Sequence, residues 1–337
     1  MKKNKTLKIL VSGYIGFNNF GDEAIFKALR LHLKKYGCVV SALSASSTYD
    51  VQTYDYKSPL AILKAILACD VLISGGGSLL QNKTSNKSLL YYLGIIFLAK
   101  LFSKKVIIFA QGIEPVEGET YQDLLKYILK QCDFISVRDK KSYDLLRSWS
   151  IKSTLVSDPI YSLLETIEPE KEKKGLVVQL RKIKDMNNNF ASDLAKVVAK
   201  YYKKVKVVSF QKEYDDEICK EFMQKFKELG GNAEYLYNAS PERIIDTINS
   251  AQYVISMRLH GLMVSNALKN QTFAVSYDEK IQTIIKEMNL QNINIYSYSF
   301  EELDKKLQEF FTKTHSIYQY RPFVWNDIDR ALIQRRN

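Results

Sequence analysis

Short apolar runs alternate with longer amphipathic stretches along most of this chain of 337 residues. A short apolar run between turn residues is typical of a buried strand, and an apolar position recurring every three to four residues is typical of a helix. Strands that alternate with helices in this way usually form a parallel sheet covered on both faces. The pattern therefore predicts an α/β fold.

The alternation forms two series. The first has predicted strands at Leu7–Ser12, Val39–Leu43, Val71–Ser74, Val106–Ala110, Phe134–Val137 and Ser153–Val156, with helices at about 22–36, 59–68, 88–102, 121–131 and 140–149. The second has strands at Leu176–Leu180, Val205–Phe210, Ala233–Leu236, Tyr253–Ser256 and Thr272–Val275, with helices at about 190–202, 215–229, 240–250, 262–268, 280–288 and 300–315. Each series predicts one doubly wound, Rossmann-type domain.

A charged segment separates the two series. Residues 167–174 read IEPEKEKK and contain almost no apolar side chain, so we interpret them as a linker. The expected domains are 1–166 and 175–316, facing each other across a cleft. The tail, 317–337, is expected to return to the first domain as a helix.

The chain is strongly basic, with a formal charge of +12 and a pI near 9.2. Two explanations remain open: a lysine-rich composition, or an anionic partner such as a phosphorylated substrate or a membrane surface. The lysines are spread along the chain without a nucleic-acid motif, so nucleic acid is not an expected partner. The longest apolar segment, Leu89–Phe102, contains Lys100 and is short for a membrane-spanning helix. We expect a soluble, cytoplasmic protein.

Glycine-rich loops follow three predicted strands of the first half, at the edge where open α/β sheets bind ligands. The loop 13–24 carries Gly16, Asn18, Gly21 and Asp22, the second loop is Gly75-Gly76-Gly77, and Gln111 begins the third. Glycine permits tight turns and close approach of a ligand. Asp22 fits either a helix N-cap or a general base.

Cationic residues occupy the same edge in both halves. Arg138 ends a strand and suits either an anion or a salt bridge to Asp139 or Asp158, while Arg258-Leu259-His260-Gly261 joins a strand to a helix N-terminus, where anions bind. Lys280 follows the next strand, and Arg181 is a further candidate. Three fixed cations and one imidazole suit a small anion carrying phosphate and carboxylate. No Cys/His cluster and no pair of carboxylates shows metal-ligand spacing, so no metal is expected. We expect no cofactor either.

The motifs, in order, resemble those of the polysaccharide pyruvyl transferases, in particular the bacterial enzymes that modify the cell-wall polysaccharide anchoring S-layer proteins. The motifs are GYIGFNNFGDEAI (13–25), SGGGSLLQ (74–81), QGIEP (111–115), SVRD (136–139), SMRLHGL (256–262) and SYDEK (276–280). The third differs from the commoner QGIGP through Glu114. The ordered set, more than any single motif, is specific.

The resemblance implies a GT-B-like fold of two Rossmann-type domains and a reaction between phosphoenolpyruvate and a sugar. The acceptor that the resemblance implies is N-acetylmannosamine on a polyprenyl-linked saccharide. The products would be a cyclic pyruvyl ketal and phosphate. Donor binding would fall on Arg138, Arg258, Leu259, His260 and Lys280, with His260 as acid and Asp22 as base. The cleft loops would supply Gly16, Asn18, Gly21, Gly75, Gly76, Gly77 and Gln111.

Two other functions fit the same residues. One is a sugar-nucleotide-dependent glycosyltransferase of GT-B architecture, and the other is a non-catalytic protein that binds an anionic glycan. A lipid-linked acceptor would also give the basic charge a role in contact with an anionic membrane. The sequence does not predict the acceptor, its linkage or the oligomeric state.

Overall fold

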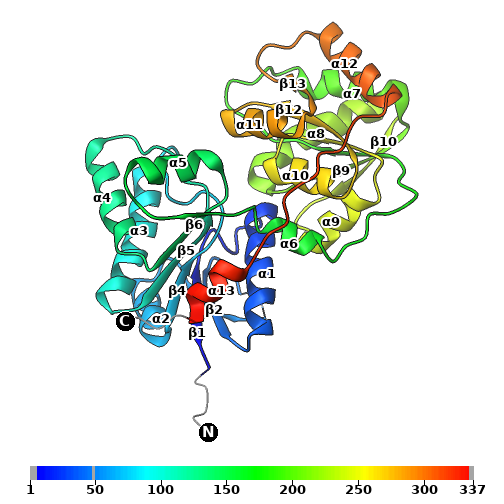
Figure 1. Cartoon of the computed structure of the whole chain (residues 1–337). Coiled ribbons are helices and arrows are strands. Elements are labelled where there is room, and N and C mark those ends of the chain that lie inside the picture. Colours follow the sequence, from blue (N-terminus) through cyan, green and yellow to red (C-terminus); the bar gives the residue numbers. More distant parts are fainter. Residues whose placement is uncertain (1–5, 48–49, 334–337) are drawn as a thin grey trace. The chain divides into compact units, whose positions relative to one another are not determined.

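The computed structural model describes residues 6–47 and 50–333, and the chain divides into two compact units. Unit 1 comprises residues 1–163 and 321–337, and unit 2 comprises 164–320. Both are α/β, with parallel strands and helices alternating along the chain as the sequence predicts (Figure 1).

In its described residues, unit 1 contains a parallel sheet in the order β3-β2-β1-β4-β5-β6-β7. The strands are β1 (Lys8–Ser12), β2 (Val39–Ser44), β3 (Gln52–Asp55), β4 (Val71–Ser74), β5 (Lys105–Gln111), β6 (Phe134–Val137) and β7 (Thr154–Leu155). The helices are α1 (Phe20–Lys35), α2 (Pro59–Ala68), α3 (Asn86–Leu101), α4 (Glu119–Lys130), α5 (Lys140–Ser148) and α13 (Asn326–Ile333). Helix α6 (Ile160–Leu164) spans the boundary between the units.

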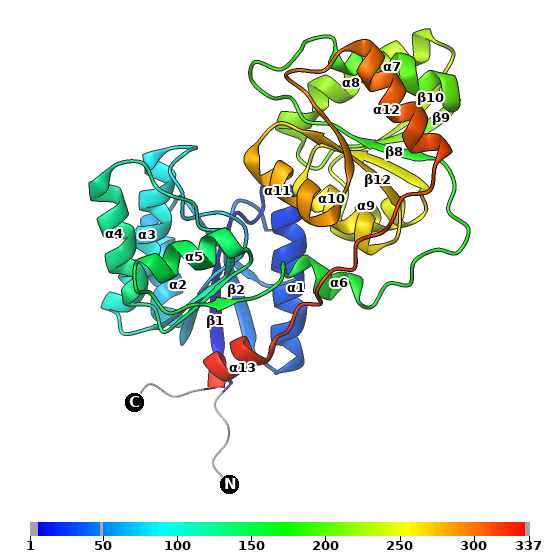
Figure 2. The same ribbon diagram turned by 45° about the horizontal axis from the view of Figure 1, so that its top comes forward.

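Helices cover both faces of this sheet. Both views place α1 and α13 on one face and α3, α4 and α5 on the other (Figures 1 and 2). The segment before α13 is held by Trp325, whose ring stacks on His32 of α1 at 3.8 Å and on Phe109 of β5 at 5.7 Å. Asp329 of α13 accepts from His32 Nε2 at 2.6 Å and from the Tyr36 hydroxyl at 2.9 Å. The segment 323–332 thus contributes buried side chains to the core of unit 1.

Unit 2 contains a second parallel sheet, in the order β10-β9-β8-β11-β12-β13 within the described part of the chain. The strands are β8 (Leu176–Gln179), β9 (Lys204–Val208), β10 (Asn232–Leu236), β11 (Tyr253–Ser256), β12 (Gln271–Ser276) and β13 (Gln291–Asn294). The helices are α7 (Phe190–Tyr201), α8 (Lys212–Glu228), α9 (Pro241–Asn249), α10 (Leu259–Ala267), α11 (Glu279–Met288) and α12 (Phe300–Thr312).

The predicted linker is an ordered part of unit 2. Lys174 N donates to Ser250 O at 3.0 Å, and Asn249, at the end of α9, donates to Glu168 O at 3.1 Å and accepts from Glu170 N at 3.1 Å. A charged segment is therefore fixed by hydrogen bonds to its backbone groups rather than by apolar contacts, which is why its composition resembles that of a linker.

The sequence pattern did not predict β3 and β13. Both are short edge strands, QTYD and QNIN, with polar side chains and partial exposure. Polar edge strands lack the apolar run that identifies a buried strand and are common because they discourage edge-to-edge association. Several predicted helix starts were also too late, among them those of α1, which begins at Phe20, and of α10, which begins at Leu259. This places Asp22 and His260 inside first helical turns.

Candidate active site

The loop after β1 is folded so tightly that several of its residues have fixed roles. Gly16 has φ +85°, and a methyl group there would lie 2.5 Å from Ser44 Oγ and 2.6 Å from Ser46 N. Gly16 N donates to the buried Glu23 carboxylate at 2.9 Å, and Asn18 has φ 54°. Gly21 N donates to the N-cap side chain of Asn19 at 3.1 Å. The N-terminus of α1 is therefore presented at the carboxyl edge of the sheet.

Asp22 does not cap this helix. The cap is Asn19, so the N-cap interpretation of Asp22 was wrong, and its carboxylate lies within the first turn of α1 with partial exposure. A methyl group at Gly77 would lie 2.7 Å from Asp22 Oδ1, so only a glycine lets the two loops approach this closely. The carboxylate and the triple-glycine loop belong to one surface of unit 1.

Gln111 fixes the conformation of the triple-glycine loop. Its amide nitrogen donates to Gly75 O, and its oxygen accepts from Leu79 N at 3.2 Å. The side chain is fully buried. Gly76 packs against Ile25 of α1, where a methyl group would lie 2.7 Å from Cγ2. Gln111 therefore shapes the loop from beneath, while Gly77 faces Asp22.

Arg138 lies on the same edge. Its guanidinium donates to Asp158 Oδ2 at 2.5 Å and to Ser78 Oγ at 3.3 Å, and its side chain is 10% exposed. Of the two salt-bridge partners expected, Asp158 is the one observed; Asp139 instead caps α5. Asp22, Gly77, Ser78 and Arg138 thus follow one another across the carboxyl edge of unit 1.

Arg258 is the most strongly positioned cation of unit 2. It is the N-cap residue of α10 and is 8% exposed. Its terminal nitrogen donates to Asp215 Oδ1 at 2.6 Å, and Asp215 is fully buried. The other oxygen of Asp215 accepts from Phe210 N at 2.7 Å and Gln211 N at 3.0 Å. Arg258 Nε is buried and has no hydrogen-bond partner among the described residues. A buried orphan donor is costly and indicates a site for an acceptor.

Gln179, at the end of β8, holds the backbone of this turn. Its side-chain oxygen accepts from Arg258 N at 2.9 Å, Met257 N at 3.2 Å and Ser256 Oγ at 3.0 Å. Gly261 packs so closely on Ser256 Oγ that any side chain would collide with it. The glycine of the RLHG motif therefore serves close packing between α10 and β11.

Arg181 and Tyr277 extend the cluster around Arg258. The Arg181 guanidinium lies over the Tyr214 ring at 5.2 Å and the Tyr277 ring at 5.9 Å, and its Nε, too, has no hydrogen-bond partner in the described part of the chain. Burial raises the pKa of the Tyr277 hydroxyl, and the charges of Arg181 and Arg258 oppose that shift. The Tyr277 phenol is therefore influenced by the charges of two guanidinium groups.

The remaining predicted residues lie on neighbouring turns. Leu259 and His260 form the first turn of α10 and are partly exposed. Lys280 is exposed in the first turn of α11, which Asp278 caps through Ile281 N at 2.8 Å. Helix N-termini favour anions because their backbone N–H groups point outward. The edge combines two such termini with several cations.

Three residues that support the site were not predicted to do so: Asp215, Gln179 and Glu23. Asp215 begins a polar run that reads as an ordinary helix start. The role of Gln179 could have been predicted from the sequence, because the amide of a glutamine that ends an apolar strand must find hydrogen-bond partners inside the protein. Gln111 ends β5 in the same way.

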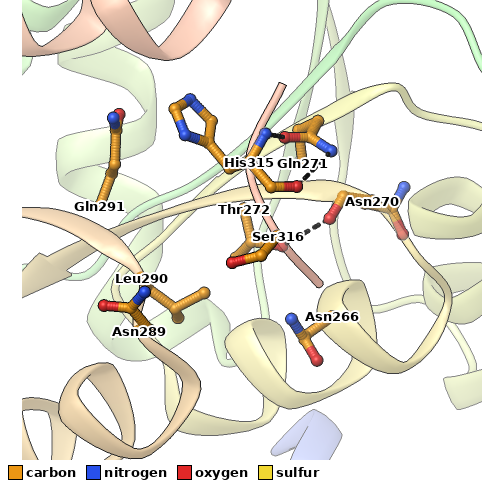
Figure 3. A pocket seen from close by; sticks show the side chains of 9 residues that line it. All are labelled: Asn266, Asn270, Gln271, Thr272, Asn289, Leu290, Gln291, His315 and Ser316. Atoms are coloured by element: carbon orange, nitrogen blue, oxygen red, sulfur yellow. Dashed lines mark hydrogen bonds between the residues drawn. The ribbon is translucent and has the colours of Figure 1, made fainter. Parts of the chain in front are cut away.

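A small pocket in unit 2 lies elsewhere. It is lined by residues at the ends of α10 and α11, at the starts of β12 and β13, and at His315 and Ser316 (Figure 3). These are the amino ends of the strands, opposite the edge that carries Arg258. None of the predicted site residues lines it.

Among residues 6–47 and 50–333, no group of histidine, cysteine and carboxylate side chains has the arrangement of a metal site. Glu114, the departure from the QGIGP pattern, pairs with Lys83 at 2.5 Å. Within the same residues, no helix combines the length and apolar character needed to cross a bilayer.

Several solved structures align with most of the chain. The UDP-GlcNAc 2-epimerase of Methanocaldococcus jannaschii, solved with UDP-GlcNAc and UDP, aligns with a TM-score of 0.64 at 14% identity over 97% of this chain and 99% of its own. A putative UDP-N-acetylglucosamine 2-epimerase of Listeria monocytogenes gives 0.63 at 10% identity over 91% and 88%. A glycosyltransferase of Rickettsia africae gives 0.55 at 14% identity over 91% and 89%. At these identities the likeness establishes the fold, which is GT-B-like.

Sequence comparison identifies the family. No curated protein matches the chain. The family model for polysaccharide pyruvyl transferases matches residues 19–279, which include Asp22, the glycine loop, Arg138 and the RLHG motif. The chain therefore belongs to the polysaccharide pyruvyl transferase family.

Proposed function

We propose that this enzyme transfers the enolpyruvyl group of phosphoenolpyruvate to a sugar and closes it into a cyclic ketal. The observation that carries the proposal is the pair of arginines, Arg258 and Arg181, near the α10 N-terminus. The buried Nε donors of both have no hydrogen-bond partner within the described part of the chain. A donor with a phosphate and a carboxylate would satisfy both. We also assign Lys280 and Arg138 to donor binding, to which each brings a positive charge.

The proposed chemistry needs one acid and one base. Protonation of the methylene carbon gives an oxocarbenium-like centre at C2, and a sugar hydroxyl attacks this centre as it loses its proton. A second hydroxyl then attacks C2, the C2–O bond to phosphate breaks, and the remaining proton leaves with the released phosphate. We assign His260 as the acid and Asp22 as the base.

The acceptor we propose is N-acetylmannosamine within a polyprenyl-linked precursor of a cell-wall polysaccharide, of the kind that anchors S-layer proteins. Such an acceptor is presented at the cytoplasmic face of a membrane. The net charge of +12 supports this proposal, because anionic lipids attract basic surfaces.

The direct test measures phosphate release from phosphoenolpyruvate with a panel of sugar acceptors, and identifies the product by mass spectrometry. We expect phosphate release that depends on the acceptor. The product should be heavier than the acceptor by the mass of one pyruvyl ketal group. Transfer from a UDP-sugar instead would favour the glycosyltransferase alternative. Saccharide binding with neither reaction would favour a glycan-binding protein.

Thermal denaturation gives a second, independent test of which donor the protein binds. A ligand that binds the folded state raises the unfolding midpoint in proportion to the logarithm of its concentration. Phosphoenolpyruvate should raise it, whereas UDP-GlcNAc should not. R258Q should abolish the shift.

A further inference from the structure

Helices α2 and α3 leave an apolar surface open on one face of unit 1. On α3 the outward row is Leu90, Gly94, Phe97 and Leu101, and on α2 it is Leu60, Lys64 and Leu67. Spacings of three and four residues place each row on one side of its helix. Leu60 is 79% exposed, Leu67 51%, Leu90 42%, Phe97 48% and Leu101 63%. We call this surface the α2–α3 face.

The inner sides of both helices are already occupied. Ile62 and Ile66 of α2 and Leu89, Leu93 and Ile96 of α3 belong to one buried cluster with the sheet. Helix α3 is apolar on nearly all sides, a pattern typical of a helix covered all round. Its outer row is therefore not needed for the core of unit 1. Large exposed apolar patches in proteins usually mark an interaction surface.

The charge on the two helices indicates which partner fits. Together α2 and α3 contain Lys64, Lys87 and Lys100 and no acidic residue. Lys100 is paired with Asp133 at 2.8 Å, while Lys64, Lys87 and the preceding Lys57 are exposed. Apolar side chains flanked by lysine, without carboxylates, suit the headgroup region of an anionic bilayer.

A second copy of the chain fits less well. A symmetric dimer would place the same face of two molecules in contact, so lysines would meet lysines. Like charges brought together at an interface oppose association. A bilayer surface provides the opposite charge, and lysine stems extend toward it while their ammonium groups stay hydrated.

We propose that the α2–α3 face docks on an anionic membrane and inserts its leucine and phenylalanine side chains at the headgroup boundary. With 16 residues, α3 is shorter than the 20 or so needed to span a bilayer, so it would lie in the plane of the interface. The inference rests on the proposed function, because a lipid-linked acceptor would require the enzyme to work at a membrane.

The test is flotation of the full chain with phosphatidylcholine vesicles that contain or lack phosphatidylglycerol. We expect binding to the anionic vesicles that weakens as salt rises. The double variant L90Q/F97Q should lower the partition coefficient about tenfold or more, because two apolar side chains no longer enter the interface. Removing a lysine, as in K64Q or K87Q, should lower it about fivefold.

Matched controls lie on α1, on the opposite face of the sheet. Leu31 is 41% exposed and Lys35 is exposed, so L31Q and K35Q make the same chemical changes at comparable sites. Both should bind vesicles like the wild type. Equal losses in the controls, or equal binding to neutral vesicles, would overturn the proposal. So would absence of vesicle binding by the wild type.

Two further measurements distinguish membrane docking from a failure of the proposed function and from dimer formation. Phosphate release with a soluble acceptor should be unchanged in L90Q/F97Q; if the wild type releases none, the proposed function fails while flotation still decides the membrane surface. Analytical ultracentrifugation that shows a dimer dissociated by F97Q would assign the face to a second copy and overturn the proposal. If L90Q/F97Q does not fold, L101Q at the end of α3 replaces it.

Discussion

Asp215 accepts a hydrogen bond from the Arg258 guanidinium at 2.6 Å, and both side chains are buried. The carboxylate reaches across from the first turn of α8, while the arginine caps α10. Two backbone N–H groups bond the other carboxylate oxygen, so Asp215 itself has little freedom to move. The orientation of the Arg258 guanidinium is therefore set by a residue outside the RLHG motif.

We predict that D215N lowers both stability and donor affinity. Weakening a buried ion pair by neutralising one partner costs as much as about 3–5 kcal/mol where the remaining charge stays buried. Asparagine keeps one acceptor oxygen, so part of this cost should be avoided. Urea denaturation gives the free energy of unfolding, and the thermal shift with phosphoenolpyruvate gives affinity. The KM for phosphoenolpyruvate should rise more than kcat falls.

Asp216 provides the control, since it is the next residue of α8. Its carboxylate pairs with the exposed Lys220 at 2.7 Å and accepts from the Tyr235 hydroxyl at 3.0 Å, and exposed ion pairs contribute about 0–1 kcal/mol. D216N should therefore resemble the wild type in both measurements. If D215N is as stable as D216N and binds the donor as well, Asp215 does not position Arg258.

The proposed acid gives a different kinetic signature. H260A should lower kcat by about a hundred- to ten-thousandfold, because general acid catalysis is lost, while donor binding changes little. R258Q should instead raise KM, because it removes the group that we propose binds the donor. The check is steady-state phosphate release for both variants at saturating acceptor. Turnover of H260A close to that of the wild type would exclude the assignment.

The sequence predicted the parallel α/β alternation and the strand ends that carry Arg138, Arg258 and His260, because buried strands have continuous apolar runs. It failed at β3 and β13, whose polar side chains match their place at sheet edges. It also gave no indication that Asp215 supports Arg258. The two residues are 43 positions apart, and a helix-start aspartate usually serves its own helix.

We predict that position 16 requires glycine for two reasons: its backbone is left-handed, and its neighbours leave no room for a side chain. Its φ is +85°, and a methyl group would press on Ser44 Oγ and on the backbone nitrogens of Ala45 and Ser46. Gly37 has φ +69° but nothing within 4 Å of the equivalent position. G37A should therefore cost about 1–2 kcal/mol, the ordinary penalty for a left-handed alanine, and G16A distinctly more. Urea denaturation of both variants tests this, and equal losses would show that crowding at Gly16 is unimportant.

The segment that leads into α13 should be essential to the stability of unit 1. Trp325 stacks between His32 and Phe109, so W325A would leave a gap and cost about 3–5 kcal/mol. Val324 is 52% exposed, and V324A should change stability little. Differential scanning calorimetry compares the two. Similar midpoints for W325A and V324A would show that the aromatic stack does not hold the C-terminal segment.

Lys173 should make the chain more stable as the pH rises above about 8. Burial lowers the pKa of its ammonium group from 10.5 to about 8, and Glu170 opposes that shift. Between these two values the unfolded chain binds a proton that the folded chain has released, so the free energy of unfolding increases with pH. K173M removes this contribution, whereas K174M, at an exposed lysine, should retain it. Urea denaturation from pH 7 to pH 10 gives the free energy of unfolding of each variant as a function of pH. If this free energy rises equally in K173M and in the wild type, Lys173 is not the cause.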